Sequence, residues 1–158
     1  MRPRCVSVVA ERKGRVSDHP RLTDELLHQI ERSKTPEAFL SSGAGSERDL
    51  PGYLNAKLEE KGLRRADVVR EAGLNETFGY QIFTGQRGAS RDKVLALGFA
   101  LKLDLHDMRL LLNQAGAADL YSKNRRDAIV IFCVSHGLTL AQADEELYRF
   151  GEKTIGDV

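Results

Sequence analysis

Residues 62–85, with the sequence GLRRADVVREAGLNETFGYQIFTG, hold two short amphipathic segments joined by a glycine turn. In the first segment Ala66, Val69 and Ala72 recur at helical spacing and are followed by Gly73. A second apolar series begins directly after that glycine. A helix that ends at a glycine and is followed within two residues by another helix turns sharply. The stretch therefore predicts two short helices that cross at a steep angle.

The second of these helices has an apolar side and a polar side. At 100° per residue Leu74, Phe78 and Ile82 fall on one stripe, which we expect to face inward. Away from it lie a carboxylate, two hydroxyls, a phenol and an amide. These side chains are Glu76, Thr77, Thr84, Tyr80 and, at the edge of the face, Gln81. The face suits the reading of base edges, because Thr contacts either base pair and Gln pairs with adenine in bidentate fashion.

Other apolar series predict helices on both sides of this stretch. We expect helices over residues 22–32, through Phe39 and Leu40 after a Thr35 cap, and over residues 49–61. Four more are expected to start after the N-capping residues Ser90, Asp104, Asn124 and Thr139. No segment of the sequence alternates apolar and polar residues with β-branched enrichment, so the fold class is predicted to be all-α.

Residues 53–112 resemble the cro/C1-type helix-turn-helix domains, also called the XRE family. The resemblance is carried by Leu54, Leu58, Gly62, Leu63, Ala66, Val69, Gly73, Ile82 and Gly85, and by the downstream residues 90–97 and 103–105. It implies a five-helix core of the lambda repressor-like fold. It also implies that double-stranded DNA is the partner and that the chain is a sequence-specific transcriptional regulator.

The resemblance also implies roles for single residues. It places Glu76, Thr77 and Gln81 at base-reading positions. It places on the DNA backbone Arg65, Asn75, Tyr80, Thr84, Arg87, Arg91 and Lys93. Two positions depart from the family pattern. Gly79 replaces a β-branched apolar residue, whose volume Phe78 is expected to supply. Glu76 either accepts a hydrogen bond from cytosine or only complements the helix dipole.

Composition and charge limit the classes of protein to which the chain can belong. Hydrophobic residues make up 41% and charged residues 30%, which is ordinary for a globular domain. The formal net charge of +1 excludes a histone-like polycation. Because one near-neutral domain neutralises few phosphates, specific binding is expected to need a homodimer. Its surface is expected in the stripe Leu22, Leu26, Leu27 and Ile30, or around Phe132, Leu147 and Phe150.

Several classes of site have no sequence signal. The two cysteines, Cys5 and Cys133, cannot form a disulfide framework, and a reducing, cytoplasmic location is expected. No apolar run approaches the roughly 18 residues of a membrane span. The four histidines lack metal-ligand spacing, and no phosphate loop or nucleophile motif is present. We therefore expect no metal, no cofactor, no membrane partner and no enzymatic activity.

The chain is expected to have four parts. Residues 1–20 are expected to form a flexible basic tail, or a DNA-contacting arm, and residues 21–47 a helical arm and linker. The helix-turn-helix domain is expected over residues 48–116. Residues 117–158 are expected to form a helical hairpin packed on the core or on a dimer partner, because the run from Ala128 to Val134 is too apolar to lie in solvent.

Residues 91–116 and 126–151 echo each other at an offset of 35 residues. Both segments begin with Arg-Asp, at Arg91 and Arg126, and both end in glycine. Two interpretations fit this pattern: two helical hairpins that share the same turn chemistry, or a duplication.

One polar cluster lies outside the helix-turn-helix stretch. It comprises Lys123, Asn124, Arg125 and Arg126. It is either a docking site for phosphate or an acidic protein partner, or a capped helix start with surface charges. Gly79, Glu76 and the near-neutral charge favour an alternative function, a protein-interaction adaptor that keeps the scaffold and no longer binds an operator.

Overall fold

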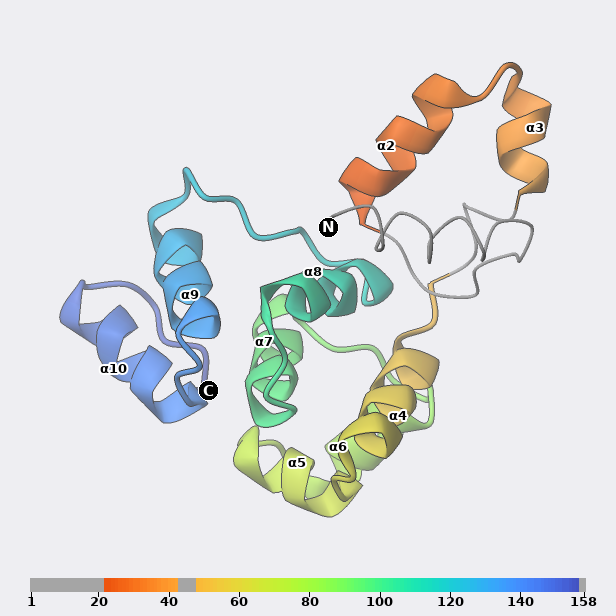
Figure 1. Cartoon of the computed structure of the whole chain (residues 1–158). Helices are drawn as coiled ribbons and strands as arrows, with labels where there is room; N and C mark the ends of the chain where they lie inside the picture. Colours follow the sequence, from red (N-terminus) through yellow and green to blue (C-terminus); the bar gives the residue numbers. More distant parts are fainter. Residues whose placement is uncertain (1–21, 43–47, 157–158) are drawn as a thin grey trace, which may run out of the picture. The chain divides into compact units, whose positions relative to one another are not determined.

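The computed structural model describes residues 22–42 and 48–156. Within these ranges the chain forms helices and no strand, which confirms the all-α prediction. The chain divides between Glu47 and Arg48 into two compact units, which we call unit 1 and unit 2 and describe separately (Figure 1). The tail predicted over residues 1–20 and most of the predicted linker lie outside the described residues.

Unit 1 contains two helices, α2 (Thr23–Arg32) and α3 (Pro36–Ser41). Thr35 caps α3, since its Oγ1 accepts a hydrogen bond from the Ala38 N–H at 3.1 Å, as its position before Pro36 predicts. On α2 the apolar side chains Leu27 and Ile30 remain about half exposed, at 53% and 47%. The two predicted helices are therefore confirmed, and the apolar stripe of α2 is only partly covered.

Unit 2 contains the remaining helices of the described chain. They are α4 (Leu50–Lys61), α5 (Arg65–Glu71), α6 (Glu76–Phe83), α7 (Arg91–Ala100), α8 (Leu105–Gln114), α9 (Arg125–Ser135) and α10 (Leu140–Arg149). The four predicted N-caps are confirmed: Ser90, Asp104, Asn124 and Thr139 each accept a hydrogen bond from a backbone N–H three residues later. Side-chain capping therefore fixes where the last four helices begin.

Helix α7 is the centre of unit 2. Every residue from Val94 to Ala100 is buried, so the helix is covered on all sides. Helices α5, α8 and α10 pack against it, while α4 packs on α6 and α8. In Figure 1, α7 and α8 lie between α9 and α10 on one side and α4, α5 and α6 on the other. The core thus joins α4, α5 and α6 to the C-terminal helices.

The C-terminal hairpin α9–α10 packs on the core of the same chain, through contacts of α9 with α8 and of α10 with α7. Val130, Cys133 and Leu147 are fully buried there. Burial of Leu147 removes it from the dimer surface expected around it. Phe132 and Phe150 stay exposed, at 53% and 42%. The apolar run of α9 is therefore covered on one side only.

The hairpins α7–α8 and α9–α10 are equivalent at an offset of 35 residues. Arg91 donates through Nε and Nη2 to the carbonyls of Ala118 and Asp119, at 2.9 and 3.1 Å. Arg126 donates through the same atoms to the carbonyls of Lys153 and Thr154, at 2.8 and 3.2 Å. Further equivalent pairs are the left-handed residues Lys102 and Gly137, the left-handed glycines Gly116 and Gly151, and the buried Leu112 and Leu147.

The two hairpins also bind each other reciprocally. Arg91 forms a bidentate ion pair with Asp127, at 3.0 and 2.9 Å, and Arg126 pairs with Asp92 at 3.0 Å. Each arginine of one hairpin therefore meets the aspartate of the other, as at a two-fold interface between identical subunits. Shared turn chemistry would not require this reciprocity. It favours the duplication interpretation.

Candidate nucleic-acid interface

The turn between α5 and α6 is set by backbone and side-chain hydrogen bonds. Gly73, at φ 71°, donates to the Arg70 carbonyl, and the Leu74 N–H donates to the Val69 carbonyl at 3.1 Å. Asn75 then caps α6, its Oδ1 accepting from the Thr77 and Phe78 N–H groups at 2.9 and 3.2 Å. The predicted helix–glycine–helix order is therefore present, and α6 begins at a fixed residue.

Gly79 lets α6 approach α5 closely. It is buried, and a Cβ at this position would lie 2.5 Å from Val69 Cγ1, well inside van der Waals contact. The Val69 side chain therefore occupies the volume that the missing side chain leaves. Our expectation that Phe78 would supply this volume is wrong, because Phe78 is half-buried beside two cations.

One cation–aromatic cluster lies on the first half of α6. The Arg65 guanidinium, from the start of α5, sits 4.8 Å from the ring centroid of Tyr80. The two side chains line a pocket of about 290 Å³ together with Ala66, Val69, Glu76 and Thr77. Four of the residues predicted to contact DNA, Arg65, Glu76, Thr77 and Tyr80, are thus brought together on one face.

A second cation–aromatic cluster surrounds Phe78. Arg87, from the loop after α6, and Lys93, from the first turn of α7, each lie 5.3 Å from the centroid of its ring. Phe78, which we expected to face inward into the core, therefore belongs to the site. Its spacing with Leu74 and Ile82 pointed inward, and no local signal showed that cations from 9 and 15 residues later would cover it.

The remaining predicted residues of α6 have mainly structural contacts. Thr84 ends the helix, with its hydroxyl donating to the Tyr80 carbonyl at 2.9 Å. The Gln81 carbonyl accepts from the N–H groups of Gln86 and Arg87, at 2.9 and 3.2 Å, while its side chain is half-buried. Gln81 therefore fixes the loop that carries Arg87.

Arg91 is not brought to this face. Its guanidinium is held by the Asp127 carboxylate and two backbone carbonyls, and only 26% of its side chain is exposed. Four of the five N–H donors of this guanidinium are therefore used inside the fold, so we withdraw Arg91 from the DNA-contacting set.

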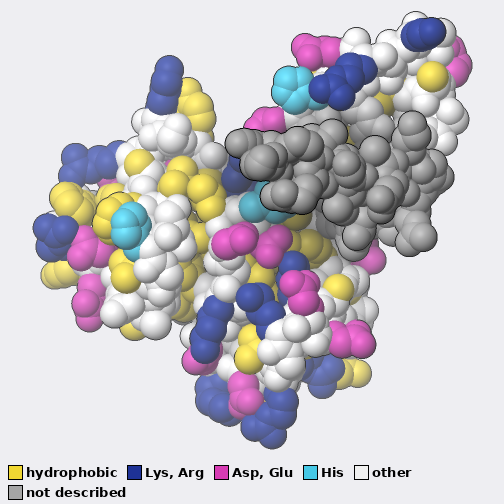
Figure 2. Space-filling model, viewed as in Figure 1, with side chains coloured by type: hydrophobic (Ala, Val, Ile, Leu, Met, Phe, Trp, Pro, Cys, Tyr) yellow, Lys and Arg dark blue, Asp and Glu magenta, His cyan; other side chains and the backbone are white. Residues whose placement is uncertain are grey.

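Basic side chains are also numerous on α5. Figure 2 shows dark-blue side chains over the α5 end of unit 2, with acidic side chains among them. Arg64 and Arg70 both pair with Asp67, at 2.9 and 2.6 Å. The hydrogen bonds from the two arginines lower the pKa of that carboxyl group. The charge of Arg64 and Arg70 is therefore partly neutralised within α5, in contrast to the cations beside α6.

The polar cluster at residues 123–126 serves the fold of the C-terminal hairpin. Asn124 caps α9, and Arg125 pairs with Glu152 at 3.2 Å. Arg126 pairs with Asp92 and donates to two carbonyls, as described above. Lys123 is exposed in the preceding turn. The structure thus favours a capped helix start over a docking site.

Within residues 22–42 and 48–156 no group of three or more His, Cys, Asp or Glu side chains could hold a metal ion. No helix in the same ranges is long and apolar enough to cross a bilayer.

Comparison of the chain with known protein families, with curated proteins and with solved structures gave no match.

Proposed function

We propose that the chain is a sequence-specific DNA-binding regulator whose helix α6 enters the major groove. The observation that supports this most is the placement of three cations beside one short helix. Arg65 lies against Tyr80, and Arg87 and Lys93 lie against Phe78, two residues earlier and about 200° around the helix, so positive charge flanks the first half of α6 on two sides. Cations in this arrangement can bind the phosphates of the two DNA strands that border the major groove, while the polar face of α6 lies between them.

Within this proposal the face divides into two roles. Thr77 and Gln81, with Glu76 at the first turn, would read base edges, since their side chains can donate or accept in the groove. Arg65, Arg87 and Lys93 would hold phosphates, with Tyr80 as an additional backbone contact. Asn75 would contribute the N-terminal end of α6, whose dipole favours an anion.

The first prediction tests both roles. Selection from a random duplex pool should enrich one sequence, and fluorescence anisotropy then measures its affinity. The change Gln81→Ala should cost about 1–3 kcal/mol on that sequence and relax preference at one base pair. The change Arg65→Ala should weaken binding to every sequence and reduce the salt slope by about one.

A matched cation provides the control. Arg149 is exposed on α10 and pairs with Glu146, away from α6 in the fold, so Arg149→Ala should bind DNA as the unchanged chain does. The proposal fails if no duplex is enriched, or if Gln81→Ala and Arg65→Ala both bind as the unchanged chain does.

The adaptor alternative is supported by a different surface. Tyr148 is 80% exposed on α10, and Phe150 lies between Arg149 and Arg125, at 4.3 and 5.9 Å from their guanidinium carbons. Exposed aromatic side chains with arginines are common at protein interfaces. A chain that enriches no duplex and loses a defined protein partner on Tyr148→Ala would be an adaptor.

A further inference from the structure

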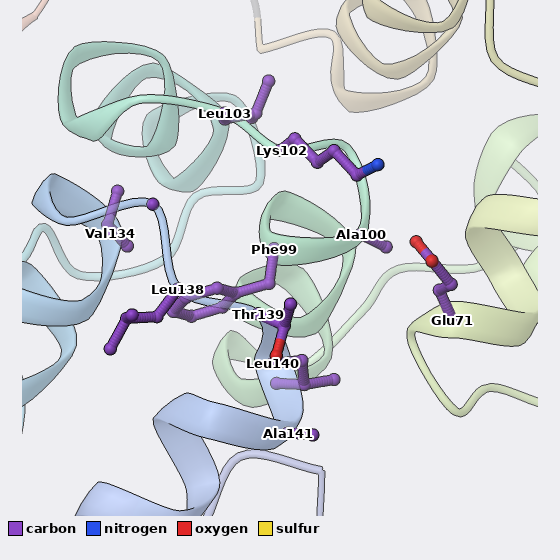
Figure 3. Close-up of a pocket in the computed structure, with 11 residues that line it drawn as sticks. Glu71, Phe99, Ala100, Lys102, Leu103, Val134, Leu138, Thr139, Leu140 and Ala141 are labelled. Atoms are coloured by element: carbon purple, nitrogen blue, oxygen red, sulfur yellow. The ribbon is translucent and has the colours of Figure 1, made fainter.

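A pocket of about 350 Å³ lies where the two hairpins and α5 meet (Figure 3). Its walls come from equivalent positions of the two hairpins: Phe99 and Val134, Lys102 and Gly137, Leu103 and Leu138. The volume falls within the roughly 300–1,000 Å³ of small-molecule sites, and most of the lining side chains are apolar. The pocket lies apart from the DNA-contacting face proposed above, because it shares no lining residue with it.

Lys102 is unusual among the residues of this pocket. Its φ is 57°, and it is the one non-glycine residue with positive φ in the part of the chain that the structure describes. The equivalent residue of the second hairpin is Gly137, at φ 68°, and both make the same backbone bonds to the preceding helix. The turn therefore works with glycine, and a lysine there adds backbone strain that the fold does not require.

A carboxylate faces the same pocket. Glu71, from the last turn of α5, lines it together with Lys102, and Figure 3 shows the charged ends of both on one side. On the other side lie the apolar side chains of Phe99, Leu138 and Leu140. In the described chain neither Glu71 nor Lys102 forms an ion pair, so the pocket offers one charge of each sign to a ligand.

The two ends of the pocket therefore differ in chemistry. The Lys102 ammonium favours a carboxylate, and Glu71 favours an ammonium group. Leu140 and Ala141, from the first turn of α10, line the pocket on the side away from Lys102 (Figure 3).

We propose that this pocket binds a small zwitterion with an apolar body, for which an apolar L-amino acid is the simplest chemistry. The ligand carboxylate meets the Lys102 ammonium, and the ligand ammonium meets the Glu71 carboxylate. The apolar body packs on Phe99 and Leu138. Binding is non-covalent and does not rest on the DNA-binding proposal.

Isothermal titration calorimetry on the full chain tests the ligand class. The probes are L-leucine, L-isoleucine and L-phenylalanine, with isovalerate and isoamylamine as compounds that each lack one charge. At least one of the amino acids should bind at one site per chain. Both single-charge compounds should bind about tenfold or more weakly than L-leucine, because each leaves one charged group without its partner.

Three variants locate the site. Lys102→Gly removes the ammonium and the backbone strain together, so the chain should remain folded while affinity falls about tenfold or more. Glu71→Gln should weaken the binding of the amino acids and leave the affinity for isovalerate unchanged. Glu59→Gln, on the exposed surface of α4, is the matched control. Ala141→Trp, from an exposed position on the pocket wall, should block binding. The proposal is overturned if no amino acid binds, if binding survives Ala141→Trp, or if isovalerate binds as tightly as L-leucine.

Discussion

Gly79 lies inside α6, where a glycine costs about 1 kcal/mol relative to alanine. By helix propensity alone, glycine is therefore an unfavourable residue at this position. The close approach of α5 explains it, since Val69 fills the space in which a Cβ would stand. At this residue, packing between two helices outweighs the preference of one helix.

The second prediction follows from that contact. Gly79→Ala should lower the free energy of unfolding by about 1–3 kcal/mol, because the added methyl group overpacks the helix crossing. Urea denaturation measures the change. Adding Val69→Ala to the Gly79→Ala variant should restore part of the lost free energy of unfolding. Gly88→Ala is the control: nothing lies within 4 Å of its Cβ, and it should change stability by less than about 0.5 kcal/mol.

At the scale of the elements, the start of α7 and the start of α9 are joined by the Arg91–Asp127 and Arg126–Asp92 ion pairs. Of the two aspartates Asp127 accepts more hydrogen bonds, since its carboxylate also accepts from the Tyr121 N–H at 3.0 Å. It is the one buried charged side chain among the described residues. These bonds hold the second hairpin to the core.

The third prediction is that Asp127→Ala lowers the free energy of unfolding by about 2–4 kcal/mol, because it leaves a partly buried guanidinium without its partner. Asp67→Ala is the comparison. Asp67 pairs with two arginines, Arg64 and Arg70, but both are exposed, so its loss should cost much less than the loss of Asp127. Equal effects of the two changes in chemical denaturation would contradict a special role for the Asp127 pair.

The fourth prediction concerns acid. Burial by itself raises the pKa of Asp92, but hydrogen bonds from Lys153 and Arg126 outweigh it, and the pKa is lowered. A carboxyl group with a lowered folded-state pKa stabilises the fold above its unfolded value of about 3.9 and loses this contribution as pH falls. The stability difference between the unchanged chain and Asp92→Asn should therefore be constant above about pH 5 and shrink below about pH 4. A difference that grows in acid, measured by urea titration, would contradict this assignment.

The helices and their starts were predictable because their signals are local. Ser90, Asp104, Asn124 and Thr139 each bond to an N–H three residues away, within the reach of a sequence pattern. The contacts of Arg91 were not predictable in the same way. Its partners lie 27 to 36 residues later, and an exposed position on a helix start fits phosphate equally well. The residues of α6 in the candidate site were therefore predictable from the sequence, whereas the contacts of the basic side chains around α6 were less so.

At the scale of the whole molecule, the equivalence of the two hairpins explains how residues 117–156 relate to residues 48–116. Helix α7 packs on both α5 and α10, so one central helix connects the candidate DNA-binding helices with the C-terminal hairpin. The reciprocal ion pairs resemble a two-fold interface within one chain. The face of α7 and α8 that a second copy would cover is thus already covered by α9 and α10. A homodimer on DNA, which we still propose, would have to use another surface.

The fifth prediction follows from this arrangement. Removal of all residues after Gly116 should uncover an apolar surface on α7 and α8, now covered by side chains such as Val130 and Leu147. It should also leave Arg91 without its carboxylate. Because the lost contact is reciprocal, the exposed face is self-complementary, and the shortened chain should self-associate or lose its cooperative unfolding. Sedimentation velocity over a micromolar range, with thermal unfolding of the same samples, distinguishes these results. A shortened chain that keeps the oligomeric state and the melting temperature of the full chain would show that the C-terminal hairpin is not part of the folded unit.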